Sequence, residues 1–136
     1  VIKPNDEGSS IGVKICKTIS SLNTSFNNLS KKYNNLIFET FIPGKEIQAA
    51  VIGGKAIGAI ELRPRRPFYD YDAKHKKSSK TLHVMPAEIS SSKYKEVLNI
   101  SKKANKVLKC KGIVRCDFRF YKEKRYWHLF SKYKKI

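Results

Sequence analysis

Arg115 and Asp117 are the residues whose types and spacing point most directly to chemistry. They stand two positions apart in an apolar run, residues 113–121, that predicts a β-strand, so both side chains project from one face. An aspartate can contribute to the oxygen shell of Mg²⁺ or Mn²⁺, and an arginine can neutralise phosphate oxygens or a developing oxyanion. The alternative is an ion pair on one strand face, which contributes about 1 kcal/mol or less when exposed. The spacing leaves both interpretations open.

A second candidate lies near the start of the chain, in the loop Gly8-Ser9-Ser10-Ile11-Gly12. Backbone N–H groups and serine hydroxyls in such a loop can converge on a phosphate. Lys3, a few residues upstream, could supply a point charge to the same anion. The loop is not a Walker motif, because no Gly-Lys-Ser/Thr precedes a helix. An ordinary turn between strands explains the glycines equally well.

Two glutamates flank the end of another predicted strand. Glu39 stands in the apolar run 36–42, where a carboxylate is costly if it is buried without a donor. It either faces solvent or accepts a hydrogen bond from an exocyclic amine such as that of adenine. Glu46, beyond Pro43-Gly44, would then meet a ribose hydroxyl.

The segment from Phe68 to Lys74 combines three aromatic residues, two aspartates and a lysine. It falls in a proline-containing stretch, from Arg63 to about Ile89, that we predict to be one long loop. Surface loops of this length usually serve binding or catalysis. The alternative is a solvated connection.

The elements that must position these residues follow from hydrophobic periodicity. Helical spacing of apolar residues predicts helices over residues 20–33 and 93–109. Gly53-Gly54 predicts a tight hairpin turn. The predicted strands are 1–4, 12–16, 36–42, 46–52, 55–62, 113–121 and 125–130, with a turn at 122–124. This pattern indicates an α+β fold, an antiparallel sheet with two helices packed on one face.

Composition sets the outer limits. The 136 residues, 40% of them hydrophobic, form one domain or part of one, and Val1 suggests a piece of a longer chain. No run approaches the roughly 20 apolar residues that a bilayer span needs. Three cysteines without metal-ligand spacing favour a reducing, cytoplasmic setting. The net charge of +18 would attract nucleic acid, anionic lipid or phosphorylated ligands, although a lysine-rich composition displayed on solvated faces explains it as well.

Taken together, these residues resemble the C-terminal ATP-grasp portion of the D-alanine–D-alanine ligases. The resemblance covers residues 1 to about 124 and leaves 125–136 as a divergent basic and aromatic tail. The matching pieces occur in the family's order: Ile2-Lys3-Pro4, Glu7-Gly8-Ser9-Ser10-Ile11-Gly12, Ile37-Phe38-Glu39, Gly44-Lys45-Glu46, Phe68-Tyr69-Asp70-Tyr71-Asp72-Ala73-Lys74, Pro86-Ala87 and Gly112-Ile113-Val114-Arg115-Cys116-Asp117-Phe118.

The resemblance implies an enzyme in which ATP phosphorylates the carboxylate of one D-alanine and the amine of a second then attacks the acyl phosphate. The dipeptide serves peptidoglycan precursor synthesis. The family is commonly dimeric, and the resemblance implies neither a membrane nor a nucleic-acid partner.

The resemblance also implies roles for individual residues. Lys3 and Lys74 would hold ATP phosphates, and the segment from Arg63 to Ile89 would close over the site as a lid. Glu39 would accept from the adenine amine, and the backbone of Thr40 to Ile42 would line the base. Glu46 would bind the ribose. Ser9 and Ser10 would meet phosphate and substrate, Arg115 would stabilise charge at the reacting carboxylate, and Asp117 would bind Mg²⁺.

Three departures from the family pattern bear on activity. His75 follows Lys74 where the family has tyrosine, and no carboxylate follows Glu123, where the family completes its magnesium site with Glu and Asn. The family's substrate-binding N-terminal domain and the first half of its ATP-grasp unit have no counterpart in these residues. We therefore expect that residues 1–136 alone do not make D-Ala-D-Ala and bind ATP in the millimolar range or more weakly.

Two alternatives remain. The tail interleaves aromatic and basic residues, which can stack bases and track phosphates or lie on anionic lipid. The residues concerned are Tyr126, Trp127, Phe130 and Tyr133 with Lys122, Lys124, Arg125, Lys132, Lys134 and Lys135. The other alternative is a decayed remnant without activity.

Overall fold

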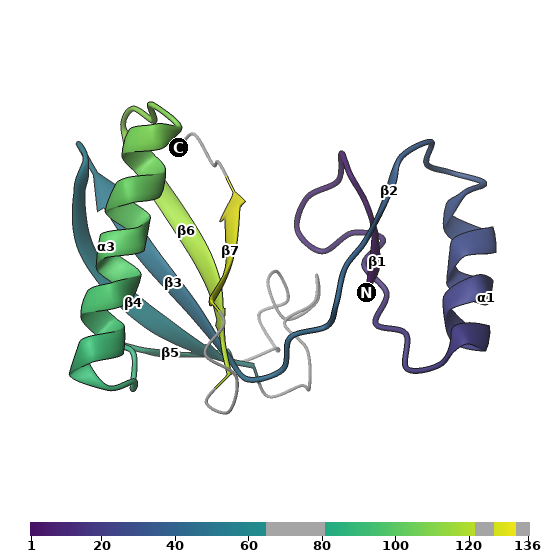
Figure 1. Ribbon diagram of the computed structural model, residues 1–136, viewed down its shortest axis with the longest axis horizontal. Coiled ribbons are helices and arrows are strands. Elements are labelled where there is room, and N and C mark those ends of the chain that lie inside the picture. The colour runs from purple at the N-terminus through teal and green to yellow at the C-terminus, as the bar shows by residue number, and fades with distance from the viewer. Residues whose placement is uncertain (65–80, 122–126, 133–136) are drawn as a thin grey trace. The chain divides into compact units, whose positions relative to one another are not determined.

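The computed structural model describes residues 1–64, 81–121 and 127–132, the last six by their backbone alone (Figure 1). The chain divides into two compact units: Val1–Phe41 with Pro64–Lys80 form unit 1, and Ile42–Arg63 with Thr81–Ile136 form unit 2. The segment from Phe68 to Lys74, His75 and the predicted turn at 122–124 lie outside the described residues, as do the tail side chains.

Unit 1 contains a two-stranded antiparallel sheet and one helix. Strand β1 (Ile2–Pro4) pairs with β2 (Leu36–Phe38), so that Ile2 faces Phe38 and Pro4 faces Leu36. Helix α1 (Ile19–Leu29) packs against β1. A capping box begins the helix, because the Ser21 N–H donates to Thr18 Oγ1 at 3.1 Å and the Thr18 N–H donates to Ser21 Oγ at 3.2 Å.

Three predicted boundaries in unit 1 are wrong. The predicted strand at 12–16 reduces to one bridge between Lys14 and Ile2, because Gly12 has a φ of +72° and interrupts the extended backbone. The strand predicted over 36–42 ends at Phe38, since its partner β1 is only three residues long. The helix predicted to reach residue 33 ends at Leu29.

Unit 2 is a five-stranded antiparallel sheet covered by one helix. The strands are β3 (Lys45–Ile52), β4 (Lys55–Arg63), β5 (Leu82–Val84), β6 (Ile113–Phe120) and β7 (Trp127–Lys132), in the order β5-β4-β3-β6-β7. Helix α3 (Ser91–Val107) lies across the sheet against β3 and β4 (Figure 1). Gly53 and Gly54 both have positive φ, which confirms the predicted tight turn between β3 and β4.

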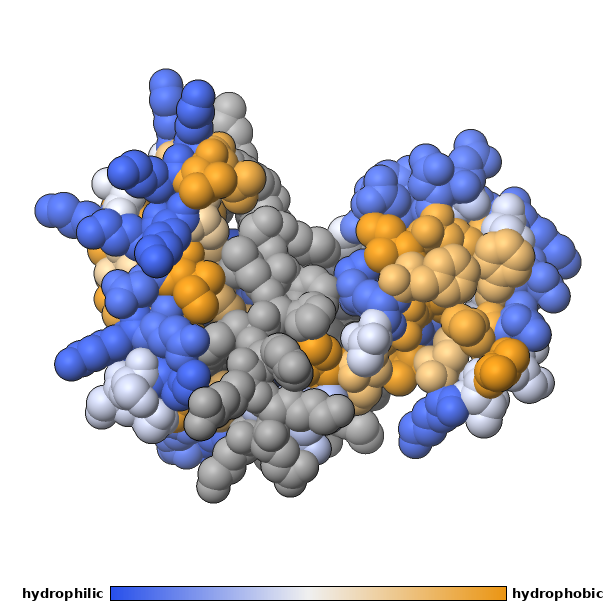
Figure 2. Space-filling model, viewed as in Figure 1, coloured by the Kyte–Doolittle hydropathy of each residue, from blue (hydrophilic) through white to orange (hydrophobic). Residues whose placement is uncertain are grey.

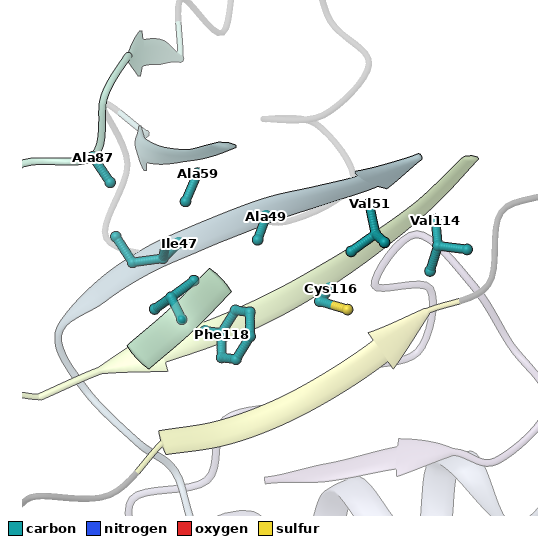
Figure 3. Close-up of a cluster of buried hydrophobic side chains, with 9 residues drawn as sticks. Ile47, Ala49, Val51, Ala59, Ala87, Val114, Cys116 and Phe118 are labelled. Carbon is teal, nitrogen blue, oxygen red and sulfur yellow. The ribbon is translucent and has the colours of Figure 1, made fainter. Parts of the chain in front are cut away.

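The core of unit 2 fills the face of the sheet beneath α3. Alternate residues of β3 and β6 point into it: Ile47, Ala49 and Val51 from β3, and Val114, Cys116 and Phe118 from β6 (Figure 3). Val97 of α3 is fully buried among them. The intervening residues, including Arg115 and Asp117, therefore project from the opposite face, as the period of two predicts.

The α+β class with antiparallel pairing is confirmed. The helices are divided between two sheets, one in each unit, rather than sharing one sheet. The loop predicted from residue 63 to 89 contains β5, which pairs with the end of β4. Among the described residues, neither helix combines the length and the apolar character that crossing a bilayer requires.

Candidate functional site

Lys3 and Glu39 are brought together in unit 1. Lys3 lies in β1 and Glu39 directly follows β2, where its N–H donates to the Val1 carbonyl at 3.0 Å. The two side chains form an ion pair, with Lys3 Nζ 2.9 Å from Glu39 Oε2, and their exposed fractions are 22% and 24%. The pair thus presents a cationic donor beside an anionic acceptor, both reachable from solvent.

The glycine-serine loop has an unusual backbone. Ser9 and Ser10 adopt φ values of +51° and +64°, a conformation that costs about 1–2 kcal/mol for a residue with a Cβ. The loop closes through a hydrogen bond from the Ile11 N–H to the Gly8 carbonyl at 2.9 Å. Two successive left-handed residues closed by this hydrogen bond form a type I′ turn, in which the Ile11 N–H is already bonded. Backbone strain of this kind is often found at functional sites, so the loop stays a candidate for ligand binding.

Arg115 and Asp117 form a bidentate ion pair on the face of β6 opposite the core. Arg115 Nε donates to Asp117 Oδ1 at 2.7 Å, and Arg115 Nη2 donates to Oδ2 at 2.9 Å. The predicted same-face placement is confirmed. Two parallel hydrogen bonds hold the guanidinium plane in one orientation, and the Arg115 side chain remains 44% exposed.

Glu46 lies at the start of β3, next to the turn at Gly44. Its Oε2 is 3.8 Å from Arg119 Nη2, and Arg119 Nη1 also donates to the Gly44 carbonyl at 3.3 Å. Thr40 and Ile42 lie between β2 and β3 in a segment without regular secondary structure, where the boundary between the units falls. Lys74 lies outside the described residues.

Sequence reasoning missed a carboxylate cluster around Glu61, which is buried at 3% exposure near the end of β4. Lys45 Nζ lies 2.9 Å from Glu61 Oε2, and Arg63 Nε lies 2.7 Å from Oε1. Arg63 also pairs with Glu88, and Lys45 Nζ donates to the Glu88 carbonyl at 2.7 Å. An acid in the apolar run Ala59-Ile60-Glu61-Leu62 is the same signal that singled out Glu39 and would have found it.

The two cations decide the charge state of Glu61. Burial raises the pKa of this carboxyl, but hydrogen bonds from Arg63 and Lys45 outweigh the burial and hold the pKa below its ordinary value. Glu61 is therefore ionised at neutral pH. The Glu61 carboxylate orients the side chains of Lys45 and Arg63. Arg63 ends β4, and the sequence continues from there to Lys74.

Magnesium requires about six oxygen ligands. Within residues 1–64, 81–121 and 127–132, no three side chains of His, Cys, Asp or Glu gather as a metal site would need. Asp117 supplies one carboxylate, and both of its oxygens accept from Arg115. The described residues do not form a magnesium site by themselves.

Comparisons with known proteins identify the fold and the family. The D-alanine–D-alanine ligase from Bacillus anthracis superimposes with a TM-score of 0.75 at 27% identity over 96% of this chain and 41% of its own length. The structure of the ligase from the same organism complexed with ATP gives a TM-score of 0.73 at 22% identity, over 96% of this chain and 39% of its own. The architecture is therefore an ATP-grasp fold.

The family model described as "D-ala D-ala ligase C-terminus" matches residues 1–129. D-alanine–D-alanine ligase from Pelagibacter ubique is 44% identical over 126 residues, which cover 93% of this chain and 41% of that protein. The chain belongs to the D-alanine–D-alanine ligase family, and it corresponds to the C-terminal part described by the family model. It spans about two fifths of the length of the relatives it matches.

Proposed function

We propose that this chain forms the nucleotide-binding C-terminal part of a D-alanine–D-alanine ligase that acts as a homodimer in the cytoplasm and supplies a peptidoglycan precursor. In this reaction a carboxylate oxygen of one D-alanine attacks the γ-phosphorus of ATP, and the bond to ADP breaks. The amine of a second D-alanine then attacks the acyl carbon, so phosphate leaves, the amine loses a proton and the peptide bond forms. The observation that carries the proposal is the ion pair between Lys3 and Glu39.

That ion pair has the donor and acceptor pattern of an adenine site. Adenine presents the N7 acceptor and the N6 amine donor side by side on one edge. Lys3 would donate to N7, or to a phosphate oxygen, while Glu39 would accept from the N6 amine. Guanine has the O6 acceptor in place of the amine and would face the Glu39 carboxylate without a hydrogen bond. The pair therefore favours ATP over GTP.

The remaining residues would serve the sugar, the phosphates and the reacting carboxylate. Glu46 would accept from a ribose hydroxyl, and the backbone from Thr40 to Ile42 would line the base. Ser9 and Ser10 would meet phosphate and substrate through the strained loop, with Lys74 as a further phosphate ligand. Arg115, held by Asp117, would stabilise negative charge at the reacting carboxylate.

We also propose that residues 1–136 by themselves do not complete the reaction. They correspond to about two fifths of the relatives, and no Asp or Glu follows Glu123. The magnesium that family members use would need ligands beyond those that the described residues supply. Purified 1–136 should show no phosphate release on addition of D-alanine in the presence of ATP and Mg²⁺. D-alanine-stimulated release would refute this part of the proposal.

A nucleotide titration tests the proposed adenine site. NMR shifts of the ¹⁵N-labelled chain would be followed as ATP or GTP is added, since this method measures millimolar affinities. We expect ATP to bind at least about fivefold more tightly than GTP, because the wrong base leaves a carboxylate unpaired. In Glu39→Gln the preference should nearly vanish, since an amide can donate to O6 as well as accept from N6.

Glu46→Gln is the matched control for the titration. It removes the same charge, but it should weaken ATP and GTP equally because both nucleotides carry the same ribose. Equal affinity of the unmodified chain for the two nucleotides would contradict the adenine site. So would a preference for ATP that survives in Glu39→Gln.

A further inference from the structure

The end of unit 2 that holds the Gly53-Gly54 turn gathers three segments. Ile52, at the end of β3, pairs with Ile113 at the start of β6, and the Gly53 N–H donates to the Gly112 carbonyl at 3.3 Å. A Cβ built on Gly54 would lie 4.0 Å from Asn105 Nδ2, so the turn also lies next to the last turns of α3. We call this region, formed by residues 52–55 and 106–113, the hairpin end.

Aliphatic side chains are exposed across the hairpin end. Val107 is 78% exposed, Leu108 47%, and the paired residues Ile52 and Ile113 are each 46% exposed. Figure 2 shows apolar surface bordered by hydrophilic side chains where α3 ends. Ile52 and Ile113 project from the sheet face opposite α3, whereas Val107 and Leu108 belong to the end of α3, so the four side chains surround the tip of the hairpin end, and we call them the apolar patch. Single exposed apolar residues are ordinary, but a group of four at one end of unit 2 favours an interaction surface.

Lysines accompany this apolar patch. Lys55, Lys106, Lys109 and Lys111 are exposed, and none of them forms an ion pair within the described part of the chain. Among the described residues, these lysines form hydrogen bonds through their backbone groups only. For example, the Lys109 N–H donates to the Lys106 carbonyl at 3.1 Å. The hairpin end thus exposes four lysine ammonium groups and four aliphatic side chains.

The described acids of unit 2 lie away from the hairpin end. Asp117 is four residues along β6 from Ile113, about 13 Å at the rise of a strand. Glu96 is ten residues along α3 from Lys106, about 15 Å at the rise of a helix. Glu46, Glu61 and Glu88 lie near the opposite ends of β3 and β4. Since the Debye length is about 8 Å at physiological salt, these acids do not cancel the positive field of the lysines.

We propose that the hairpin end docks on an anionic phospholipid bilayer. Its aliphatic side chains enter the boundary between headgroups and acyl chains, and the four lysines pair with lipid phosphates. The combination selects lipid over single-stranded nucleic acid, because bases are held by aromatic stacking and the residues of this end are aliphatic. This partner departs from the family resemblance, which implies none, and it does not depend on the proposed ligase activity.

Vesicle co-sedimentation with the full 136-residue chain tests the proposal. The chain should bind vesicles that contain phosphatidylglycerol, bind phosphatidylcholine vesicles much more weakly, and dissociate as salt is raised. The triple variant Lys106→Gln, Lys109→Gln, Lys111→Gln should lose affinity on the order of 100-fold, at about fivefold per lysine. Val107→Ser should lose about tenfold, since it removes the most exposed aliphatic side chain of the patch.

Each variant has a matched control in unit 1. The triple variant Lys17→Gln, Lys31→Gln, Lys32→Gln removes the same charge from exposed positions, and Ile19→Ser alters a helical side chain that is also 78% exposed. Both controls should bind phosphatidylglycerol vesicles within about twofold of the unmodified chain. Circular dichroism would establish that all four variants fold.

Three results would overturn the proposal. Equal loss in the matched triple variants would show that net charge, not the hairpin end, attracts the vesicles. Unchanged binding of Val107→Ser would exclude insertion of the aliphatic patch. Binding to a single-stranded oligonucleotide that is stronger than binding to the vesicles, and is lost in the Lys106, Lys109 and Lys111 variant, would assign this surface to nucleic acid.

Discussion

Lys45 Nζ lies 2.9 Å from an oxygen of Glu61, a carboxylate whose side chain is almost completely buried. Lys45 begins β3, Glu61 lies near the end of β4, and the same ammonium donates to the carbonyl of Glu88, beyond β5. The Lys45 ammonium therefore joins β3 to β4 through the ion pair, and to the residues that precede α3 through the hydrogen bond to Glu88. Arg63 completes the cluster by binding both Glu61 and Glu88.

Glu61→Gln should destabilise unit 2 by about 2–3 kcal/mol, because hydrogen bonds between charged groups are lost, Lys45 loses the carboxylate beside it, and Arg63 keeps only Glu88. The urea midpoint followed by the fluorescence of Trp127 measures this change, since the single tryptophan lies in β7 of the same sheet. Glu88→Gln is the control, because Glu88 is largely exposed and its loss should cost less than about 1 kcal/mol. Equal effects of the two substitutions would contradict the assignment.

The pH dependence of stability should carry the signature of Glu61. Burial raises the pKa of this carboxyl, but the hydrogen bonds from Arg63 and Lys45 lower the pKa by more than burial raises it, so the net pKa is below the ordinary 4.5. A lowered folded-state pKa adds stability that is complete above the unfolded-state pKa and is lost as the pH falls through the folded-state pKa. Urea midpoints from about pH 6 down to about pH 3 should therefore fall less steeply in Glu61→Gln than in the unmodified chain. An identical slope would show that other carboxylates control acid unfolding.

Gly44 and Gly53 should respond very differently to alanine. A Cβ at Gly44 would lie 2.1 Å from the Phe120 carbonyl oxygen, and its φ is +100°. At Gly53 nothing lies within 4 Å, and only the φ of +53° disfavours a side chain. We expect Gly53→Ala to cost about 1 kcal/mol and Gly44→Ala about 3 kcal/mol or more, since a clash with backbone adds to the strain. Denaturant midpoints would measure both, and a smaller cost at Gly44 would mean that the start of β3 can move away from β6.

Cys116 and Cys16 should differ in reactivity toward iodoacetamide. Burial raises the pKa of the Cys116 thiol, and although a bond to Ser101 lowers it, the net pKa is above its ordinary value. Cys16 is only half-buried, in unit 1. Alkylation followed by mass spectrometry should modify Cys16 at least about 100-fold faster, because Cys116 reacts only when unit 2 opens. Glu61→Gln should accelerate Cys116 and leave Cys16 unchanged, whereas equal acceleration would indicate that the units open together.

Features that depend on local pattern could be read from the residues alone. The β3–β4 hairpin follows from Gly53-Gly54, which supply the two positive φ angles that the tight turn needs. Helix α3 and the alternation of β6 follow from apolar spacing. Arg115 and Asp117 could be placed on one face of β6 because successive strand residues must alternate, whatever the rest of the chain does.

Features that depend on distant partners could not be read in this way. The predicted strand at 12–16 fails because only Lys14 meets β1, and β2 stops where its three-residue partner stops. Strand β5 escaped notice because three residues carry too little pattern, and pairing with the end of β4 defines it.

The same division holds for the candidate site. Sequence spacing could nominate Lys3 and Glu39 separately, yet only the pairing of β1 with β2 brings their side chains to 2.9 Å. Glu61 is instructive for the same reason, since its burial is tolerable only because Lys45 and Arg63 reach it. Side-chain alternation is a property of each strand, whereas the partner of a charge depends on chain segments that folding brings together.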